Sequence, residues 1–178
     1  MDNEIPDSAQ AGFVHIYHGP GKGKTTAAVG QAVRARGAGM PVAFMQFMKD
    51  GTSSEVPMLQ ALGVQYITAG SHGWAYDGMD ISQQEHASVL YREARTLVQQ
   101  EGMVVLDEIL NVPLAGGAPF RYRDIAALVR SRNPNTELIL TGRECSRQLV
   151  MMADYVTRMQ QIAHPFTAGA IARPGIEY

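Results

Sequence analysis

The sequence has a single cysteine and no strong excess of charge of either sign, and each of these scarcities excludes a class of protein. Cys145 has no second cysteine with which to form an internal disulfide, and no histidine cluster lies near it to complete a zinc site. The net charge of −2 provides no basic surface of the kind that binds DNA or RNA. A nucleic acid is therefore not the expected partner.

Long apolar runs are also missing from the chain. No stretch reaches the roughly 18 uninterrupted apolar residues of a membrane helix, so no membrane span is expected. The acidic beginning, MDNEIPDSAQA, lacks the basic and apolar regions of a secretory signal, and we therefore expect a cytoplasmic protein. The chain does have 46% hydrophobic residues over 178 positions, enough for one compact core. We expect a flexible N-terminal segment at residues 1–11 and a single domain at residues 12–178.

Short apolar strands alternate with helical patterns along the chain. Strands are expected at Phe13–Tyr17, Val42–Phe47, Val64–Ile67, Met103–Leu106 and Leu138–Leu140. Helices are expected at Thr25–Arg36 and Ser54–Leu62, from a capping box of Ser82 and Glu85 toward Gly102, at Tyr122–Val129 and at Leu149–Ala153. Such alternation predicts an α/β fold with a doubly wound, mostly parallel sheet and helices on both faces, whose ligands bind beyond the carboxyl ends of the strands.

The stretch HGPGKGKTT, from His18 to Thr26, is one residue short of a standard phosphate-binding loop. The Walker A pattern G-x-x-x-x-G-K-[ST] would place its first glycine at His18, whereas the first glycine is Gly19. The stretch nevertheless follows an expected strand and opens an expected helix, which is the context that such a loop requires. The sequence therefore favours a phosphate loop altered for a reaction other than ordinary γ-phosphate cleavage.

The residues of this loop suit the binding of a nucleotide. Glycines at 19, 21 and 23 let the backbone turn sharply and direct N–H groups inward, and the positive end of the following helix also attracts an anion. Lys24 supplies a mobile positive charge for phosphate oxygens, and Thr25 supplies a hydroxyl that can ligate Mg²⁺.

Two carboxylates complement the loop further along the chain. VVLDE is an apolar strand that ends in Asp107 and Glu108. The carboxyl end of this strand brings both side chains to the same edge of the sheet as the loop, and either of them can hold magnesium or its water. Elsewhere, Trp74 lies in the loop GSHGWAYDG, where it serves either as a wall against a ligand or as a local hydrophobic anchor.

Six stretches in this order carry a resemblance to a known family: GPGKGKTT, VAFMQFMKD, the tryptophan loop, VVLDEILN, ILTGRECSRQLVMMAD and RPGIEY. Over about residues 12–178 the sequence resembles the ATP:corrinoid adenosyltransferases of the CobA/BtuR type, which have a P-loop NTPase-like (RecA-like) fold. The shortened loop combined with TGR and the final GIEY is the most specific part of the match.

The resemblance implies that the 5′-deoxyadenosyl group of ATP passes to the cobalt(I) of a reduced corrinoid and that triphosphate leaves. ATP would lie reversed in the shortened loop, with its γ-phosphate where an ordinary loop holds the α-phosphate. Lys24, Thr25 and Glu108 would be catalytic, and Thr25, Glu108 and Asp107 would hold Mg²⁺ or Mn²⁺. The residues that would bind ATP are Gly19, Pro20, Gly21, Lys22, Gly23, Lys24, Thr25, Thr26 and Arg143.

The resemblance also implies the partners. His72 and Trp74 would lie near a corrinoid such as cobalamin, cobinamide or cobyrinic acid diamide, and His72 stands where the family often has phenylalanine. The electron donor would be a reductant such as reduced flavodoxin, and the assembly a homodimer. The eleven residues before Gly12 are too few for the arginine-rich helix with which some members cover the site. Two alternatives stay open: a P-loop ATPase or small-molecule kinase, and a non-catalytic, nucleotide-dependent corrinoid carrier.

Overall fold

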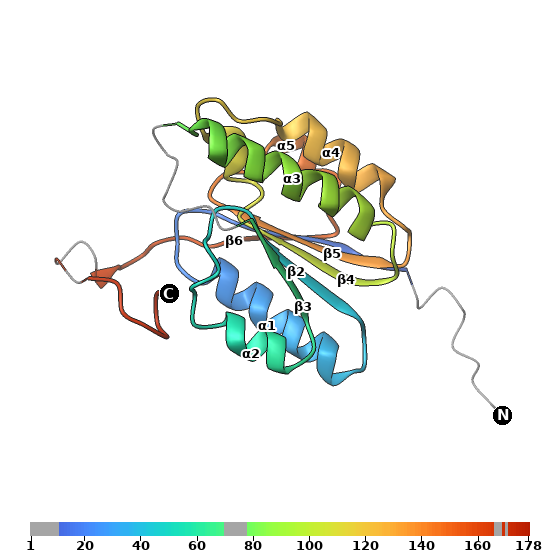
Figure 1. Cartoon of the computed structure of the whole chain (residues 1–178), viewed down its shortest axis with the longest axis horizontal. Coiled ribbons are helices and arrows are strands. Elements are labelled where there is room, and N and C mark those ends of the chain that lie inside the picture. Colours follow the sequence, from blue (N-terminus) through green and yellow to red (C-terminus); the bar gives the residue numbers. More distant parts are fainter. Residues whose placement is uncertain (1–10, 70–77, 166–168, 170) are drawn as a thin grey trace.

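The computed structural model describes residues 11–69, 78–165, 169 and 171–178 of the chain. Within them, six strands form one sheet in the order β3-β2-β4-β5-β1-β6, and every neighbouring pair is parallel (Figure 1). The strands are β1 (Val14–His18), β2 (Val42–Gln46), β3 (Gln65–Thr68), β4 (Gly102–Asp107), β5 (Thr136–Gly142) and β6 (Tyr155–Arg158).

Helices cover both faces of this sheet (Figure 1). On one face lie α1 (Lys24–Gly37) and α2 (Val56–Ala61), and on the other lie α3 (Ile81–Leu97), α4 (Tyr122–Ser131) and α5 (Arg147–Val150). A short 3₁₀ helix, η2 (Val112–Leu114), lies in the loop after β4. No helix in the described part of the chain is both long enough and apolar enough to cross a membrane. The predicted α/β, doubly wound, P-loop NTPase-like class is confirmed.

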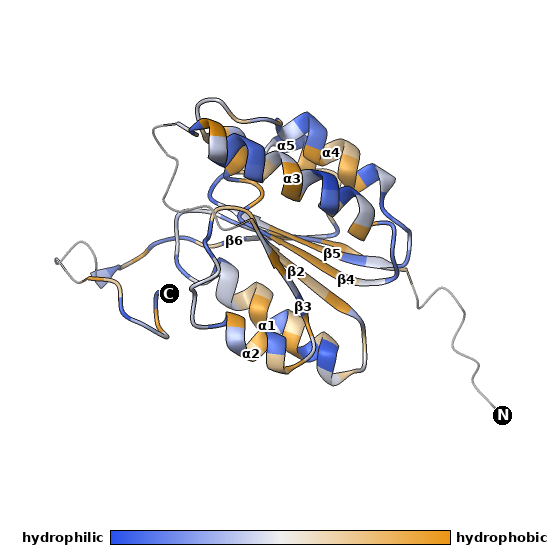
Figure 2. Ribbon diagram, viewed as in Figure 1, coloured by the Kyte–Doolittle hydropathy of each residue, from blue (hydrophilic) through white to orange (hydrophobic). Residues whose placement is uncertain are grey.

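The central strands are apolar on both sides because each side is covered by helices. Successive side chains point to opposite faces of a strand, so Phe44 and Val105 pack with Ala28 of α1, whereas their neighbours Met45 and Leu106 enter the larger layer under α3 and α4. Figure 2 shows the resulting pattern, with hydrophobic strands in the middle and hydrophilic outer faces on the helices. Each fully buried side chain of this kind contributes roughly 1.5–3 kcal/mol to folding.

The strand order determines where the functional residues meet. Because β5 lies between β1 and β4, the loop after β1 faces the end of β4 across one intervening strand. All carboxyl ends share one edge in a parallel sheet. The phosphate loop and the Asp107–Glu108 pair are therefore brought together at that edge, as the sequence predicts.

The predicted capping box of the helix before Gly102 is wrong by two residues. Asp80, not Ser82, is the N-cap of α3; its carboxylate accepts from the Gln83 N–H at 2.8 Å, and the Gln83 side-chain oxygen accepts from the Asp80 N–H at 3.0 Å. Both D-x-x-Q and S-x-x-E fit the capping pattern, and the extended backbone of Asp80 decides between them.

Two elements near the C-terminus also differ from the prediction. Strand β6 was not predicted, because its residues YVTR are exposed and carry no apolar run; its place is fixed by main-chain pairing with β1. Helix α5 ends at Val150, so Ala153, expected on a helix face, lies beyond it.

Candidate functional site

The loop between β1 and α1, residues 19–23, has the backbone conformation of an anion-binding turn. Gly19 and Gly23 have φ angles of 113° and 111°, which only glycine adopts without strain. Gly23 is also the N-cap of α1, so the first N–H groups of the helix, beginning at Lys24, have no partner within the helix. These donors and the helix dipole together form a site for a negatively charged group.

The glycines also let the loop pack closely against the segment after β6. A Cβ on Gly19 would lie 2.4 Å from the Met159 carbonyl oxygen. A Cβ on Gly21 would lie 2.8 Å from the main chain of Gln160. The Gly19 N–H donates to the Arg143 carbonyl at 2.9 Å, and the Gly21 N–H donates to Met159 at 2.8 Å. Two N–H groups expected to face a ligand are thus used inside the protein, which leaves the later part of the loop and the first turn of α1 to supply donors for an anion.

Lys24 lies folded back over its own loop. Its ammonium donates to the carbonyl oxygens of Gly19 at 2.9 Å and of Gly21 at 2.7 Å. Burial, and then the positive charge of Arg143, lower the pKa of the Lys24 side chain. An incoming phosphate can replace these two carbonyl oxygens with charged acceptors, which form stronger hydrogen bonds.

Thr25 points from the first turn of α1 to Asp107 at the end of β4. Thr25 Oγ1 donates to Asp107 Oδ1 at 3.0 Å. Asp107 is fully buried and also accepts from Thr141 Oγ1 at 2.7 Å and from Gln46 Nε2 at 3.1 Å, while the Lys49 ammonium lies 3.5 Å away. The Asp107 carboxylate is therefore held by donors from α1, β2 and β5, and by the Lys49 ammonium from the loop after β2, before any ligand arrives.

Glu108 differs from its neighbour because part of its carboxylate has no partner. It is the one non-glycine residue with a positive φ, 63°, in the part of the chain that the structure describes. Its side chain is buried, and Oε2 is among the few buried side-chain atoms there that lack a hydrogen-bond partner. Burial, and then the adjacent Asp107, raise the pKa of Glu108 to about 8. A positive φ is energetically unfavourable for a non-glycine residue, and a buried acceptor without a partner is rare. Together they indicate that Glu108 occupies a functional position.

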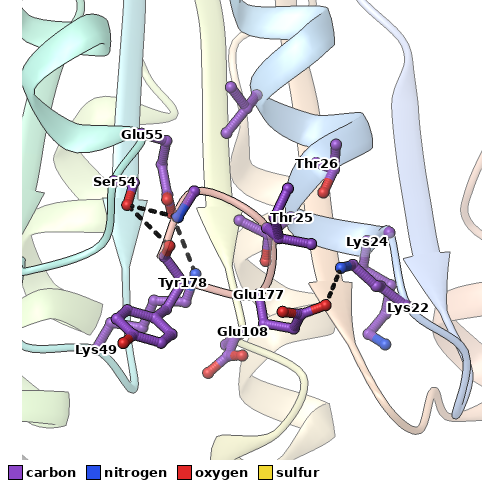
Figure 3. A pocket seen from close by; sticks show the side chains of 14 residues that line it. Lys22, Lys24, Thr25, Thr26, Lys49, Ser54, Glu55, Glu108, Glu177 and Tyr178 are labelled. Atoms are coloured by element: carbon purple, nitrogen blue, oxygen red, sulfur yellow. Dashed lines mark hydrogen bonds and ion pairs between the residues drawn. The ribbon is translucent and has the colours of Figure 1, made fainter. Parts of the chain in front are cut away.

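Lys24, Thr25 and Glu108 line one pocket of about 480 Å³ (Figure 3). This volume falls within the roughly 300–1,000 Å³ range of small-molecule sites. The phosphate loop and the first turn of α1 form one side, Glu108 lies at the bottom, and Lys49, Ser54 and Glu55 lie on the opposite side. Residues Gly175–Tyr178 of the C-terminal segment complete the lining.

Sequence reasoning missed the polar side chains contributed by β2 and β5. Gln46, at the end of β2, donates to Glu55 Oε1 at 3.0 Å, and Lys49 pairs with the same oxygen at 3.2 Å. Thr141, near the end of β5, accepts from the Glu108 N–H at 2.8 Å. The available signal was a polar residue at the carboxyl end of an apolar strand, where the site of such a sheet lies.

The structure places the other predicted site residues as follows. Lys22, Gly23, Lys24, Thr25, Thr26 and Glu108 line the pocket. Arg143 supports the loop through its carbonyl, and its exposed side chain is not part of the pocket lining; Pro20 is likewise exposed and outside it. His72 and Trp74, predicted to lie near a corrinoid, fall outside the described residues.

The parallel sheet, the glycine loop at the start of α1 and the buried Asp107 opposite Thr25 define a P-loop nucleotide-binding protein. The comparisons with known proteins are more specific. Residues 10–178 match the family described as ATP:corrinoid adenosyltransferase BtuR/CobO/CobP, and the chain belongs to this family.

Individual relatives agree with this assignment. The chain is 34% identical over 180 residues to a corrinoid adenosyltransferase of Sinorhizobium sp, covering 95% of this chain and 81% of the relative. It is 32% identical to the corrinoid adenosyltransferase CobA of Salmonella typhimurium, covering 95% and 87% of the two chains. It is 31% identical to a corrinoid adenosyltransferase of Pseudomonas aeruginosa, covering 100% and 90%. The predicted resemblance is confirmed, and membership favours a transferase over the ATPase, kinase and carrier alternatives.

Proposed function

We propose that this chain transfers the 5′-deoxyadenosyl group of ATP to the cobalt(I) of a reduced corrinoid and releases triphosphate, the reaction of its family. The observation that carries the proposal is the phosphate loop, one residue shorter than the Walker A pattern, which opens α1 on a pocket with a buried carboxylate pair. In this reaction the whole triphosphate is the leaving group, so the loop acts on phosphates that are never separated from one another.

The chemistry requires positioning and charge stabilisation more than activation. Cobalt(I) is a strong nucleophile, so the protein has to hold the ribose C5′ in line and stabilise the charge that develops on the departing triphosphate. We assign triphosphate binding to residues 19–26, with the N–H donors from Lys22 onward and the Lys24 ammonium as the groups nearest the phosphates. Arg143 contributes by holding the loop through its carbonyl.

The residues present fit Mg²⁺, or Mn²⁺ in its place. Glu108 Oε2 is a buried oxygen without a partner, and Thr25 offers a hydroxyl in the lining of the same pocket. Magnesium commonly takes one or two protein oxygens and completes its coordination with phosphates and water. When bound, the metal would neutralise charge on the triphosphate oxygens. Because Asp107 already accepts from Thr25, Thr141 and Gln46, we assign it the orientation of Thr25 and assign the direct metal contact to Glu108.

The remaining assignments rest on the family resemblance. We propose that His72 and Trp74 lie against the corrinoid, which is cobalamin, cobinamide or cobyrinic acid diamide. The electron donor is a reductant such as reduced flavodoxin, and the active assembly is a homodimer in the cytoplasm.

The phosphate product tests the proposal directly. The protein is incubated with ATP, Mg²⁺ and each chemically reduced corrinoid, and the phosphate species and the adenosylcorrinoid are quantified. Equal amounts of triphosphate and adenosylcorrinoid are expected. Diphosphate would identify an ATPase or a kinase, and binding of both substrates without any product would identify a carrier.

A further inference from the structure

The C-terminal segment lies against the phosphate loop although 155 residues separate the two contacting positions. Residues Arg173–Tyr178, here called the C-terminal arm, are held at two places. Glu177 Oε1 accepts from the Lys22 ammonium at 2.8 Å, and Ser54 Oγ donates to the main-chain oxygen of Tyr178 at 2.8 Å (Figure 3). The arm thus spans the pocket from the loop before α1 to the segment before α2.

The arm is ordered by its own hydrogen bonds. The Arg173 N–H and guanidinium Nε donate to Glu177 Oε2 at 2.9 and 3.2 Å, and the Gly175 N–H donates to the Tyr178 main-chain oxygen at 2.6 Å. The hydrogen bonds from Arg173 and then from Lys22 hold the pKa of Glu177 at about 2. A turn closed in this way loses little further conformational entropy when a ligand packs against it.

The two sides of the pocket offer different chemistry to a ligand. The phosphate loop contributes N–H donors and the Lys24 ammonium, which suit phosphate oxygens. The arm contributes Ile176 and Tyr178, whose side chains are half exposed, and Val29 of α1 lies in the same lining. Apolar and aromatic surfaces of this kind suit the flat face of a nucleobase and the carbon atoms of a ribose.

We infer that the C-terminal arm is the nucleoside-binding wall of this pocket, and that the Lys22–Glu177 ion pair holds the arm in place. The inference rests on the proposed function, since it assigns the adenosine half of the same ATP molecule. Lys22 then has two separate uses: its main-chain N–H faces the triphosphate, whereas its side chain is a positioning group for the arm. Lys24 remains the lysine whose side chain contacts phosphate.

The test compares ATP with inorganic tripolyphosphate, which lacks the nucleoside, in calorimetric titrations of the full chain with Mg²⁺. Gly175→Ala introduces a side chain where φ is 71°, so it disturbs the turn, although no atom lies within 4 Å of the added Cβ. Glu177→Gln removes the charge that pairs with Lys22. For both variants the dissociation constant of ATP should rise about tenfold relative to the unaltered protein, as expected when one contact that positions the nucleoside is lost. The dissociation constant of tripolyphosphate should stay within about twofold of its value for the unaltered protein.

Two matched controls separate the arm from general effects. Gly39→Ala places the same methyl group at a φ of 81°, also with no atom within 4 Å, in the turn after α1 at the opposite edge of the sheet. Glu85→Gln removes one carboxylate from the exposed side of α3. Neither control should change binding of ATP or tripolyphosphate.

A double variant tests whether the ion pair acts as a unit. If Lys22 and Glu177 work through each other, Lys22→Gln combined with Glu177→Gln should weaken ATP binding no more than Lys22→Gln alone. Equal weakening of ATP and tripolyphosphate in the arm variants would mean that the arm supports the phosphate loop instead. Tighter ATP binding in Glu177→Gln would make Glu177 a competitor of the phosphates, and unchanged ATP binding would remove the arm from the site.

The proposed function fails by a different result. If tripolyphosphate does not bind the unaltered protein and is not its product, the adenosyl-transfer assignment is lost whatever the arm does. If tripolyphosphate binds and is produced but the arm variants behave like the controls, only the inference about the arm is overturned.

Discussion

Thr25 and Asp107 are 82 residues apart in the chain, yet Thr25 Oγ1 donates to Asp107 Oδ1 at 3.0 Å across the end of β5. The contact joins the first turn of α1 to the end of β4; Thr25 lines the pocket, and Asp107 is buried behind it. Because the Thr25 hydroxyl donates its hydrogen bond to Asp107, the lone pairs of Thr25 Oγ1 stay available to a metal or a water. The site is therefore preorganised, which is how most catalytic electrostatic stabilisation is supplied.

Lys24→Ala should lower the rate of adenosylation by at least about 100-fold, the cost of removing one preorganised charge-stabilising donor. Lys24 is the lysine whose ammonium already lies over the phosphate loop, held by two of its carbonyls. The rate is measured with chemically reduced corrinoid at saturating ATP. Arg34→Ala removes the same charge from the last turn of α1 and should leave the rate unchanged. Near-normal turnover of Lys24→Ala would disprove the assigned role.

Glu108→Gln should raise the magnesium concentration needed for half-maximal activity by at least ~10-fold, because loss of a group that supports a metal typically weakens metal binding by this factor. The variant keeps the shape of the side chain but cannot ionise, so the buried oxygen that has no partner can no longer become a charged metal ligand. Near neutral pH the metal-free variant should be about as stable as the unaltered protein, because a pKa of about 8 already leaves the Glu108 carboxyl mostly protonated. Above pH 8 the variant should be the more stable of the two, because it carries no buried charge beside Asp107. Magnesium titrations and thermal denaturation measure the two effects, with Glu101→Gln as a surface control. An unchanged titration would place the metal elsewhere.

The sheet and the phosphate loop could be predicted because local signals determine them. Uninterrupted apolar strands such as Met103–Leu106 require burial on both faces, and glycines before a GKT sequence require a turn that leads into a helix. The position of Asp107 and Glu108 beside the phosphate loop could also be predicted, since a parallel sheet brings the carboxyl ends of its strands to one edge.

The contacts that Lys49, Thr141 and Glu177 make could not be predicted. A polar residue at the end of an apolar strand marks only the edge of the sheet where Thr141 lies, whereas its partners depend on strand order, and the contact of Glu177 depends on the C-terminal arm returning to the loop. Thr141 reaches Asp107 only because β5 lies between β1 and β4, which no local pattern specifies. The Lys22–Glu177 pair joins residues 155 positions apart, and GIEY by itself has the composition of an ordinary turn. Strand β6 escaped prediction for a related reason: an exposed edge strand needs no apolar run.

Gly30→Ala should stabilise the protein by roughly 0.5–1 kcal/mol, because glycine in a helix interior costs about this much relative to alanine. Gly30 lies within α1, and no atom lies within 4 Å of an added Cβ. Denaturant unfolding measures the gain, and adenosylation should be unaffected. Gly21→Ala provides the contrast, since its Cβ would meet main-chain atoms 2.8 Å away and should displace the loop, with loss of activity. A destabilised Gly30→Ala variant would contradict the packing of α1 described above.

Thr141→Val and Thr136→Val provide a matched pair at opposite ends of β5. Both threonines are buried, and each loses a hydroxyl that bonds to neighbouring groups: Thr141 bridges the Asp107 carboxylate and the Glu108 N–H, whereas Thr136 donates to the Gln100 carbonyl. Leaving such buried groups unsatisfied costs about 1–3 kcal/mol, so unfolding experiments should find both variants less stable. Only Thr141→Val should lower kcat, by about 10-fold or more, since its hydroxyl orients the carboxylates beside the metal position. The comparison is made at a temperature where both variants remain folded. Equal rates for the two would mean that the hydroxyl of Thr141 serves stability alone and that Asp107 keeps its orientation through Thr25 and Gln46.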